Sequence, residues 1–93
     1  MTVPESKIES GYCASVRESG GEAYKFVSPG RCGVPDRLAL YPIPPEHRGI
    51  VALYVRFAEL KAPGKKPEPC QRREHARLRK MGFIVDVVDR LKD

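Results

Sequence analysis

Two carboxylates and a lysine in this sequence have the side-chain chemistry that metal-assisted hydrolysis uses. Asp36 opens a short apolar run directly after Pro35, and Glu59 lies near the end of a longer apolar run, two residues before Lys61. Because side chains alternate along a strand, Glu59 and Lys61 are expected on one face and Leu60 on the other. Mg²⁺ binds one or two carboxylates together with waters and substrate phosphates. A neighbouring lysine can orient a water or stabilise charge on phosphate oxygens.

Each of these motifs also has an ordinary structural explanation. Pro-Asp is a common turn dipeptide, and Glu-x-Lys occurs by chance in many proteins, so either one alone favours a structural role. The metal-site hypothesis depends on their joint placement, since Asp36 and Glu59 are expected on adjacent strands.

Glu9 is expected to approach the same place from a helix. It lies on the stripe formed by Tyr12, Cys13 and Val16, together with Ile8. A carboxylate on an inward helix face is costly without a partner. That partner is either a metal ion or an arginine, and the spacing does not choose between them.

A later helix carries two more polar residues on one face. Gln71 follows the loop that leaves Lys61, so it could position water or phosphate at the site; the alternative is a plain polar residue at a helix start. His75, four residues on, is interpreted as structural or phosphate-binding rather than as a metal ligand.

Prolines and glycines divide the chain into six expected elements. Their order is helix, three strands, helix and strand, at residues 4–17, 23–27, 37–41, 50–61, 68–81 and 83–88. Residues 28–33 are expected to form a loop and 42–49 a proline-rich turn, which makes the second and third strands antiparallel. The third strand is expected to be buried, and the last strand to be parallel to a neighbour. The predicted fold class is α/β, a single domain over 1–93 with a small mixed sheet flanked by helices.

Composition excludes several classes of protein. The 93 residues are 31% charged and 41% hydrophobic, which is typical of a small folded domain. No apolar run is long enough to span a membrane, and the first residues do not resemble a secretory signal. Three cysteines without a C-x-x-C pair argue against a zinc site or a disulfide framework, so a reducing, cytoplasmic setting is expected.

The positive charge is concentrated in one stretch. The chain has a net charge of +5, whereas residues 61–80 alone carry eight basic and two acidic residues, or +6. Such a stretch is typical of contact with a phosphate backbone, although a solvated helix face is the alternative. The expected DNA-binding residues are Lys65, Lys66, Arg72, Arg73, Arg77 and Lys80.

Three motifs in this order resemble one nuclease family. They are Gly33-Val34-Pro35-Asp36, then Glu59-Leu60-Lys61, then Gln71 with His75. Together they resemble the virus-type replication–repair nuclease (VRR-NUC) family of the PD-(D/E)xK superfamily. The resemblance implies a restriction-endonuclease-like αβββαβ core that hydrolyses phosphodiester bonds in DNA with Mg²⁺ or Mn²⁺.

The resemblance also implies roles for individual residues. Asp36 and Glu59 would be metal ligands together with the Leu60 backbone carbonyl, and Lys61 the catalytic lysine. Glu9 would be the first-helix acid and a further ligand, and Gln71 an accessory residue. Because Gly11 makes the helix register less certain, Glu5 is an alternative to Glu9.

The leading hypothesis is a structure-selective DNA endonuclease. Stand-alone members of the family resemble homodimeric phage enzymes that act on branched DNA, including four-way (Holliday) junctions, and no membrane partner is expected. The alternative is a non-cleaving DNA-binding accessory module of a phage recombination or repair system. A protein unrelated to nucleic acid is the third class, and the basic stretch beside the carboxylates argues against it.

Overall fold

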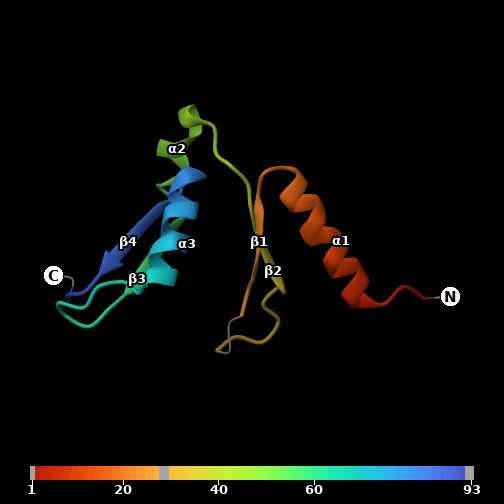
Figure 1. Ribbon diagram of the computed structural model, residues 1–93, viewed down its shortest axis with the longest axis horizontal. Helices are drawn as coiled ribbons and strands as arrows, with labels where there is room; N and C mark the ends of the chain where they lie inside the picture. The colour runs from red at the N-terminus through yellow and green to blue at the C-terminus, as the bar shows by residue number, and fades with distance from the viewer. Residues whose placement is uncertain (1, 28–29, 92–93) are drawn as a thin grey trace. The chain divides into compact units, whose positions relative to one another are not determined.

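The computed structural model describes residues 2–27 and 30–91 (Figure 1). The chain divides into two compact units, residues 1–42 and 43–93. Each unit contains one two-stranded sheet and is considered by itself. The α/β class is therefore confirmed, whereas the restriction-endonuclease-like core stays a prediction.

The first unit is a helix on a β-hairpin. Helix α1 (Glu5–Glu18) is followed by the antiparallel strands β1 (Glu22–Lys25) and β2 (Arg37–Leu40), which agree with the expected elements. Val16 and Leu40 form its buried core. The expected stripe was too wide, because Ile8 and Tyr12 are exposed, and the inward face of α1 follows Glu9, Cys13 and Val16. The predicted loop 28–33 lies partly outside the described residues.

The second unit is a parallel strand pair with helices. Its elements in order are α2 (Pro45–Val51), β3 (Arg56–Leu60), α3 (Pro69–Lys80) and β4 (Ile84–Val88). Strands β3 and β4 run parallel, as expected for a last strand that follows a helix, with Arg56 opposite Ile84 and Leu60 opposite Val88. Helix α3 packs against β4. The buried apolar residues of this unit are Ile43, Leu78, Met81, Phe83 and Val85.

Two sequence predictions for this unit were wrong. The expected turn at 42–49 contains helix α2, because Pro45 occupies the first turn, where its missing N–H costs nothing. The expected strand at 50–61 begins only at Arg56, because Ile50 and Val51 complete α2. The strand is also not buried: its residues alternate between exposed and half-buried.

The strand pairing also differs from the expected single mixed sheet. The described strands form two two-stranded sheets, β1–β2 and β3–β4. Strand β2, which Asp36 precedes, pairs with β1, and β3, which carries Glu59, pairs with β4. The expected antiparallel pairing of the second and third strands is therefore wrong for the described residues. Among those residues, no helix has the length and apolar character needed to cross a membrane.

Candidate active site

Strand β3 directs Glu59 toward helix α3. Along β3, Phe57 and Glu59 are half-buried, and Ala58 and Leu60, which alternate with them, are exposed. Lys61, one residue past the strand, is half-buried like Glu59, and its backbone N–H donates to the Val88 carbonyl at 2.9 Å. This alternation confirms that Glu59 and Lys61 share one face and Leu60 lies on the other.

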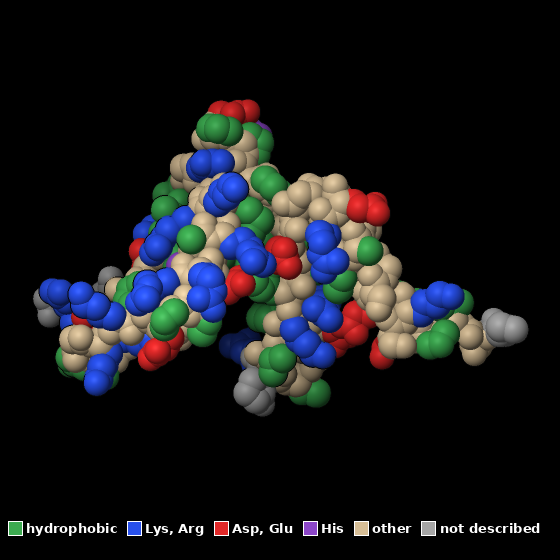
Figure 2. All heavy atoms as spheres, in the orientation of Figure 1, with side chains coloured by type: hydrophobic (Ala, Val, Ile, Leu, Met, Phe, Trp, Pro, Cys, Tyr) green, Lys and Arg blue, Asp and Glu red, His purple; other side chains and the backbone are tan. Residues whose placement is uncertain are grey.

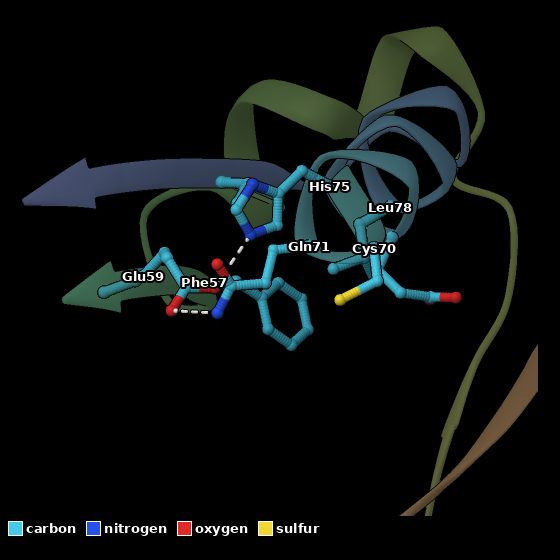
Figure 3. A pocket seen from close by; sticks show the side chains of 9 residues that line it. Phe57, Glu59, Cys70, Gln71, His75 and Leu78 are labelled. Atoms are coloured by element: carbon cyan, nitrogen blue, oxygen red, sulfur yellow. Dashed lines mark hydrogen bonds and ion pairs between the residues drawn. The ribbon is translucent and has the colours of Figure 1, made fainter. Parts of the chain in front are cut away.

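Both oxygens of the Glu59 carboxylate have a partner on α3 (Figure 3). The Gln71 amide Nε2 donates to Glu59 Oε2 at 3.2 Å. His75 Nε2 lies 3.1 Å from Glu59 Oε1, and a bond to an ionised carboxylate requires the imidazole proton on this nitrogen. Since residues four apart lie on one helix face, the two donors approach the carboxylate from consecutive turns.

The start of α3 holds Gln71 in place. Glu68, the N-cap residue, accepts a hydrogen bond from the Gln71 backbone N–H, and the Gln71 Oε1 accepts one from the Glu68 backbone N–H at 2.8 Å. This reciprocal pair is a capping box. The amide oxygen of Gln71 is therefore used by the helix cap, while its nitrogen reaches Glu59.

A pocket of about 350 Å³ opens beside these groups. Its lining is mainly apolar and includes Phe57 and Leu78, and the polar side chains of Glu59, Gln71 and His75 also face it (Figure 3). A half-buried carboxylate next to an apolar wall is the environment in which a bound cation would be only partly hydrated.

In the first unit, Glu9 forms an ion pair with an arginine. Arg37 Nε donates to Glu9 Oε2 at 2.7 Å, and Arg37 Nη1 donates to the Ala23 carbonyl at 3.2 Å. The hydrogen bond and charge of Arg37 lower the pKa of Glu9, and the same bond raises the pKa of Arg37. Of the two partners expected for Glu9, the structure contains the arginine.

Asp36 and both candidate first-helix acids line the same hollow of the first unit. These acids are Glu5 and Glu9, and the hollow has a volume of about 280 Å³, with Arg37 at its edge. Asp36 itself is exposed, and its backbone carbonyl accepts a hydrogen bond from the Phe26 N–H. The choice between Glu5 and Glu9 as the first-helix acid stays open, and a role of either at a metal site stays a prediction.

The donor chemistry suits a hard divalent cation. Each Glu59 oxygen accepts one hydrogen bond and retains a further lone pair. Oxygen donors are the ligands that Mg²⁺ and Mn²⁺ prefer. Within residues 2–27 and 30–91, no three His, Cys, Asp or Glu side chains lie close enough to hold a metal together, but Mg²⁺ needs only one or two carboxylates. The roles of Asp36, Glu59 and the Leu60 carbonyl as ligands stay predictions.

The residues of the expected DNA-binding surface are exposed. Figure 2 shows Lys and Arg side chains gathered over α3 of the second unit. Arg72 donates to the Pro67 carbonyl at 2.9 Å, and Arg77 lies 3.7 Å from Glu74. The exposed basic residues are Lys65, Lys66, Arg72, Arg73, Arg77 and Lys80.

His75 is the residue whose part in the site the sequence did not predict. Its burial was foreseeable, because it shares a helix face with Leu78, but its bond to Glu59 depends on how α3 crosses β3. The four-residue spacing between Gln71 and His75 was the available signal, since two donors one turn apart can hold a single carboxylate.

Comparison with known proteins finds a phage relative. The chain is 51% identical over 87 residues to a protein named "Putative nuclease p44" from Acyrthosiphon pisum secondary endosymbiont phage 1. The aligned region covers 94% of this chain and 84% of the relative. No family model matches the chain, and no solved structure matches it. The resemblance to the VRR-NUC family therefore stays a prediction.

Proposed function

This chain belongs to the same protein family as the phage protein p44, and we propose that it is a metal-dependent, structure-selective DNA endonuclease. The observation that carries the proposal is the Glu59 carboxylate, half-buried on β3 and hydrogen-bonded through both oxygens to α3. We propose DNA as its substrate. We further propose the VRR-NUC type of site, branched DNA such as four-way junctions, and a homodimer as the active form.

The proposed metal is Mg²⁺ or Mn²⁺, held by Asp36, Glu59 and the Leu60 backbone carbonyl. When bound, such an ion polarises a phosphate oxygen and lowers the pKa of a coordinated water. Lys61, on the Glu59 face of β3, would stabilise negative charge that develops on the phosphate oxygens. We propose that the main role of Glu9 is its ion pair with Arg37, because this pair holds α1 against the start of β2 next to Asp36.

The basic residues of 65–80 would hold the phosphate backbone of the substrate. Lys and Arg side chains neutralise phosphates without reading sequence, so this surface suits a nuclease that selects its substrate by shape. Neither Arg72 nor Arg77 is prevented from such contacts by burial, since both are exposed.

The test uses labelled splayed arms, flaps and four-way junctions, incubated with Mg²⁺ or Mn²⁺ and with a chelator as control. Cleavage of branched substrates that stops on chelation is expected. Asp36→Asn and Glu59→Gln should each abolish cleavage and leave DNA binding at the wild-type level or tighter, because they remove ligands and negative charge.

Two other outcomes decide against the proposal. Undiminished cleavage by either variant would remove the two-carboxylate site from the mechanism. Wild-type protein that binds junctions tightly but leaves them uncut with either metal would establish the alternative, a non-cleaving DNA-binding accessory module.

A further inference from the structure

We propose that His75 and Gln71 are positioning residues, which hold the Glu59 carboxylate in the orientation in which it binds a divalent metal. This inference rests on the proposed nuclease function. The sequence suggested that Gln71 positions water or phosphate. In this inference Gln71 acts on Glu59 instead.

The burial of His75 and Glu59 favours a built arrangement over a chance contact. His75 is only 6% exposed, and the Glu59 side chain is 24% exposed. Removing a carboxylate from most of its water is costly unless its oxygens gain hydrogen bonds. Glu59 has one such bond on each oxygen, at 3.2 Å from Gln71 and 3.1 Å from His75.

The bonds restrict how Glu59 can bind a metal. Gln71 and His75 each occupy one lone pair of the carboxylate, one on each oxygen. A metal ion that binds through the remaining lone pairs leaves both bonds intact, and the two bonds limit the directions from which it can approach. Carboxylate ligands are commonly oriented by hydrogen bonds of this kind from residues that do not touch the metal.

The two donors are themselves held by α3. The Gln71 amide oxygen is fixed by the Glu68 N–H in the capping box. His75 lies one turn before Leu78, which is buried in the core of the second unit. Turning Gln71 or His75 away from Glu59 would disturb the helix cap or move a buried ring, so both bonds favour one orientation of the carboxylate before any metal binds.

The test compares two amides that differ by one methylene. The Nε2 of a glutamine can occupy the place of the histidine Nε2, whereas the amide of an asparagine stops one atom short. His75→Gln should therefore retain the bond to Glu59, and His75→Asn should lose it. The matched controls are His47→Gln and His47→Asn, since His47 is the exposed histidine of α2 and has no part in the proposed site.

Three measurements separate orientation from folding. Calorimetry gives the half-saturating Mn²⁺ concentration of the protein without DNA, binding assays in chelator give the Kd for a junction, and thermal unfolding gives the Tm. His75→Asn should raise the half-saturating Mn²⁺ concentration by about 10- to 100-fold, and His75→Gln by no more than about threefold. The junction Kd of both His75 variants should match that of wild type. The His47 variants should match wild type in all three measurements.

The outcomes distinguish this inference from the proposed function. If His75→Gln and His75→Asn weaken Mn²⁺ binding equally, or lower only the Tm, His75 is a structural residue and the inference is wrong. If His75→Asn does not fold, Gln71→Leu takes its place as the test and should raise the half-saturating Mn²⁺ concentration. An unchanged concentration for Gln71→Leu would also show that the inference is wrong. Wild-type protein that neither binds Mn²⁺ nor cleaves DNA overturns the proposed function, and the inference with it.

Discussion

At the scale of single residues, the Glu9–Arg37 pair makes the first unit sensitive to acid. Arg37 lowers the pKa of Glu9 below its ordinary value of 4.5, so folding favours the ionised carboxylate. A lowered folded-state pKa contributes stability that is present above the ordinary value and is lost as the pH falls through the folded-state value. The ion pair should therefore stabilise the protein near neutral pH and cease to do so in acid.

Glu9→Gln tests this expectation. Thermal unfolding from about pH 7 down to about pH 3 should show a lower Tm for the variant at neutral pH and a difference that shrinks below pH 4.5. Glu5→Gln, one turn earlier on the exposed part of α1, is the control and should show a smaller difference, since it loses only the interaction of its charge with the helix N-terminus. A constant difference across the whole pH range would show that the carboxylate charge is not responsible.

Lys61 should act on the reaction rather than on binding. If its ammonium group stabilises charge in the transition state, Lys61→Ala should lower kcat by on the order of 10²-fold or more, with a much smaller change in DNA Kd. Single-turnover cleavage and binding in chelator measure the two quantities. A loss mainly in Kd, with a weaker salt dependence, would make Lys61 a backbone contact only.

From the sequence we could predict which candidate side chains share a face of a strand, but not which side chains they pair with. Glu59 and Lys61 share a face because strand periodicity is a local property. The partner of Glu9 is Arg37, 28 positions away, and helical spacing does not contain that information. Distant pairs of this kind depend on how elements pack, which is why both an arginine and a metal were open before the structure.

At the scale of elements, the segment from Pro44 to Leu60 shows where local patterns mislead. A run of β-branched and aromatic residues favours a strand only when its side chains fit a pleated surface. Here Ile50 and Val51 end a helix, and a turn follows before β3 begins at Arg56. The prolines before α2 were interpreted as a turn, although proline in the first turn is compatible with a helix. The helices α1 and α3 were predictable because their periodic stripes are long.

Gly82, which ends α3, should tolerate no side chain. Its φ of +104° is unfavourable for L-residues, and an added Cβ would lie 2.5 Å from Arg48 Nε. Arg48 cannot simply move, because that nitrogen donates to the Ile43 carbonyl at 2.9 Å. Gly82→Ala should therefore destabilise the protein by about 1–3 kcal/mol in denaturant unfolding.

Gly49 provides the matched control for that substitution. It lies inside α2 with no atoms within 4 Å of an added Cβ. Gly49→Ala should stabilise the protein by up to about 1 kcal/mol, because alanine is the better helix former. Equal effects of the two substitutions would mean that neither the backbone of Gly82 nor its contact with Arg48 matters.

At the scale of the whole molecule, the charge distribution and the exposed apolar side chains suggest two kinds of contact. The basic stretch 61–80 lies in the second unit and suits a phosphate backbone. The same unit exposes a run of apolar side chains in the turn after α2, where Leu53 is 74% and Tyr54 is 83% exposed. Large apolar groups left in water by a small domain are typical of a protein–protein interface.

These features predict a homodimer that binds a junction through its basic surfaces. Two-fold dimers are the commonest oligomers, and two sites are needed for paired incisions in a four-way junction. Light scattering should give a dimer, and junction affinity should fall with salt with a log–log slope of about −0.9 per phosphate neutralised.

Leu53→Glu should produce a monomer that makes single, unpaired nicks. Leu91→Glu, at a leucine that is more exposed (94%) but lies outside this run, should remain dimeric. A wild-type monomer at micromolar concentration that makes unpaired nicks would instead indicate a nickase or flap nuclease.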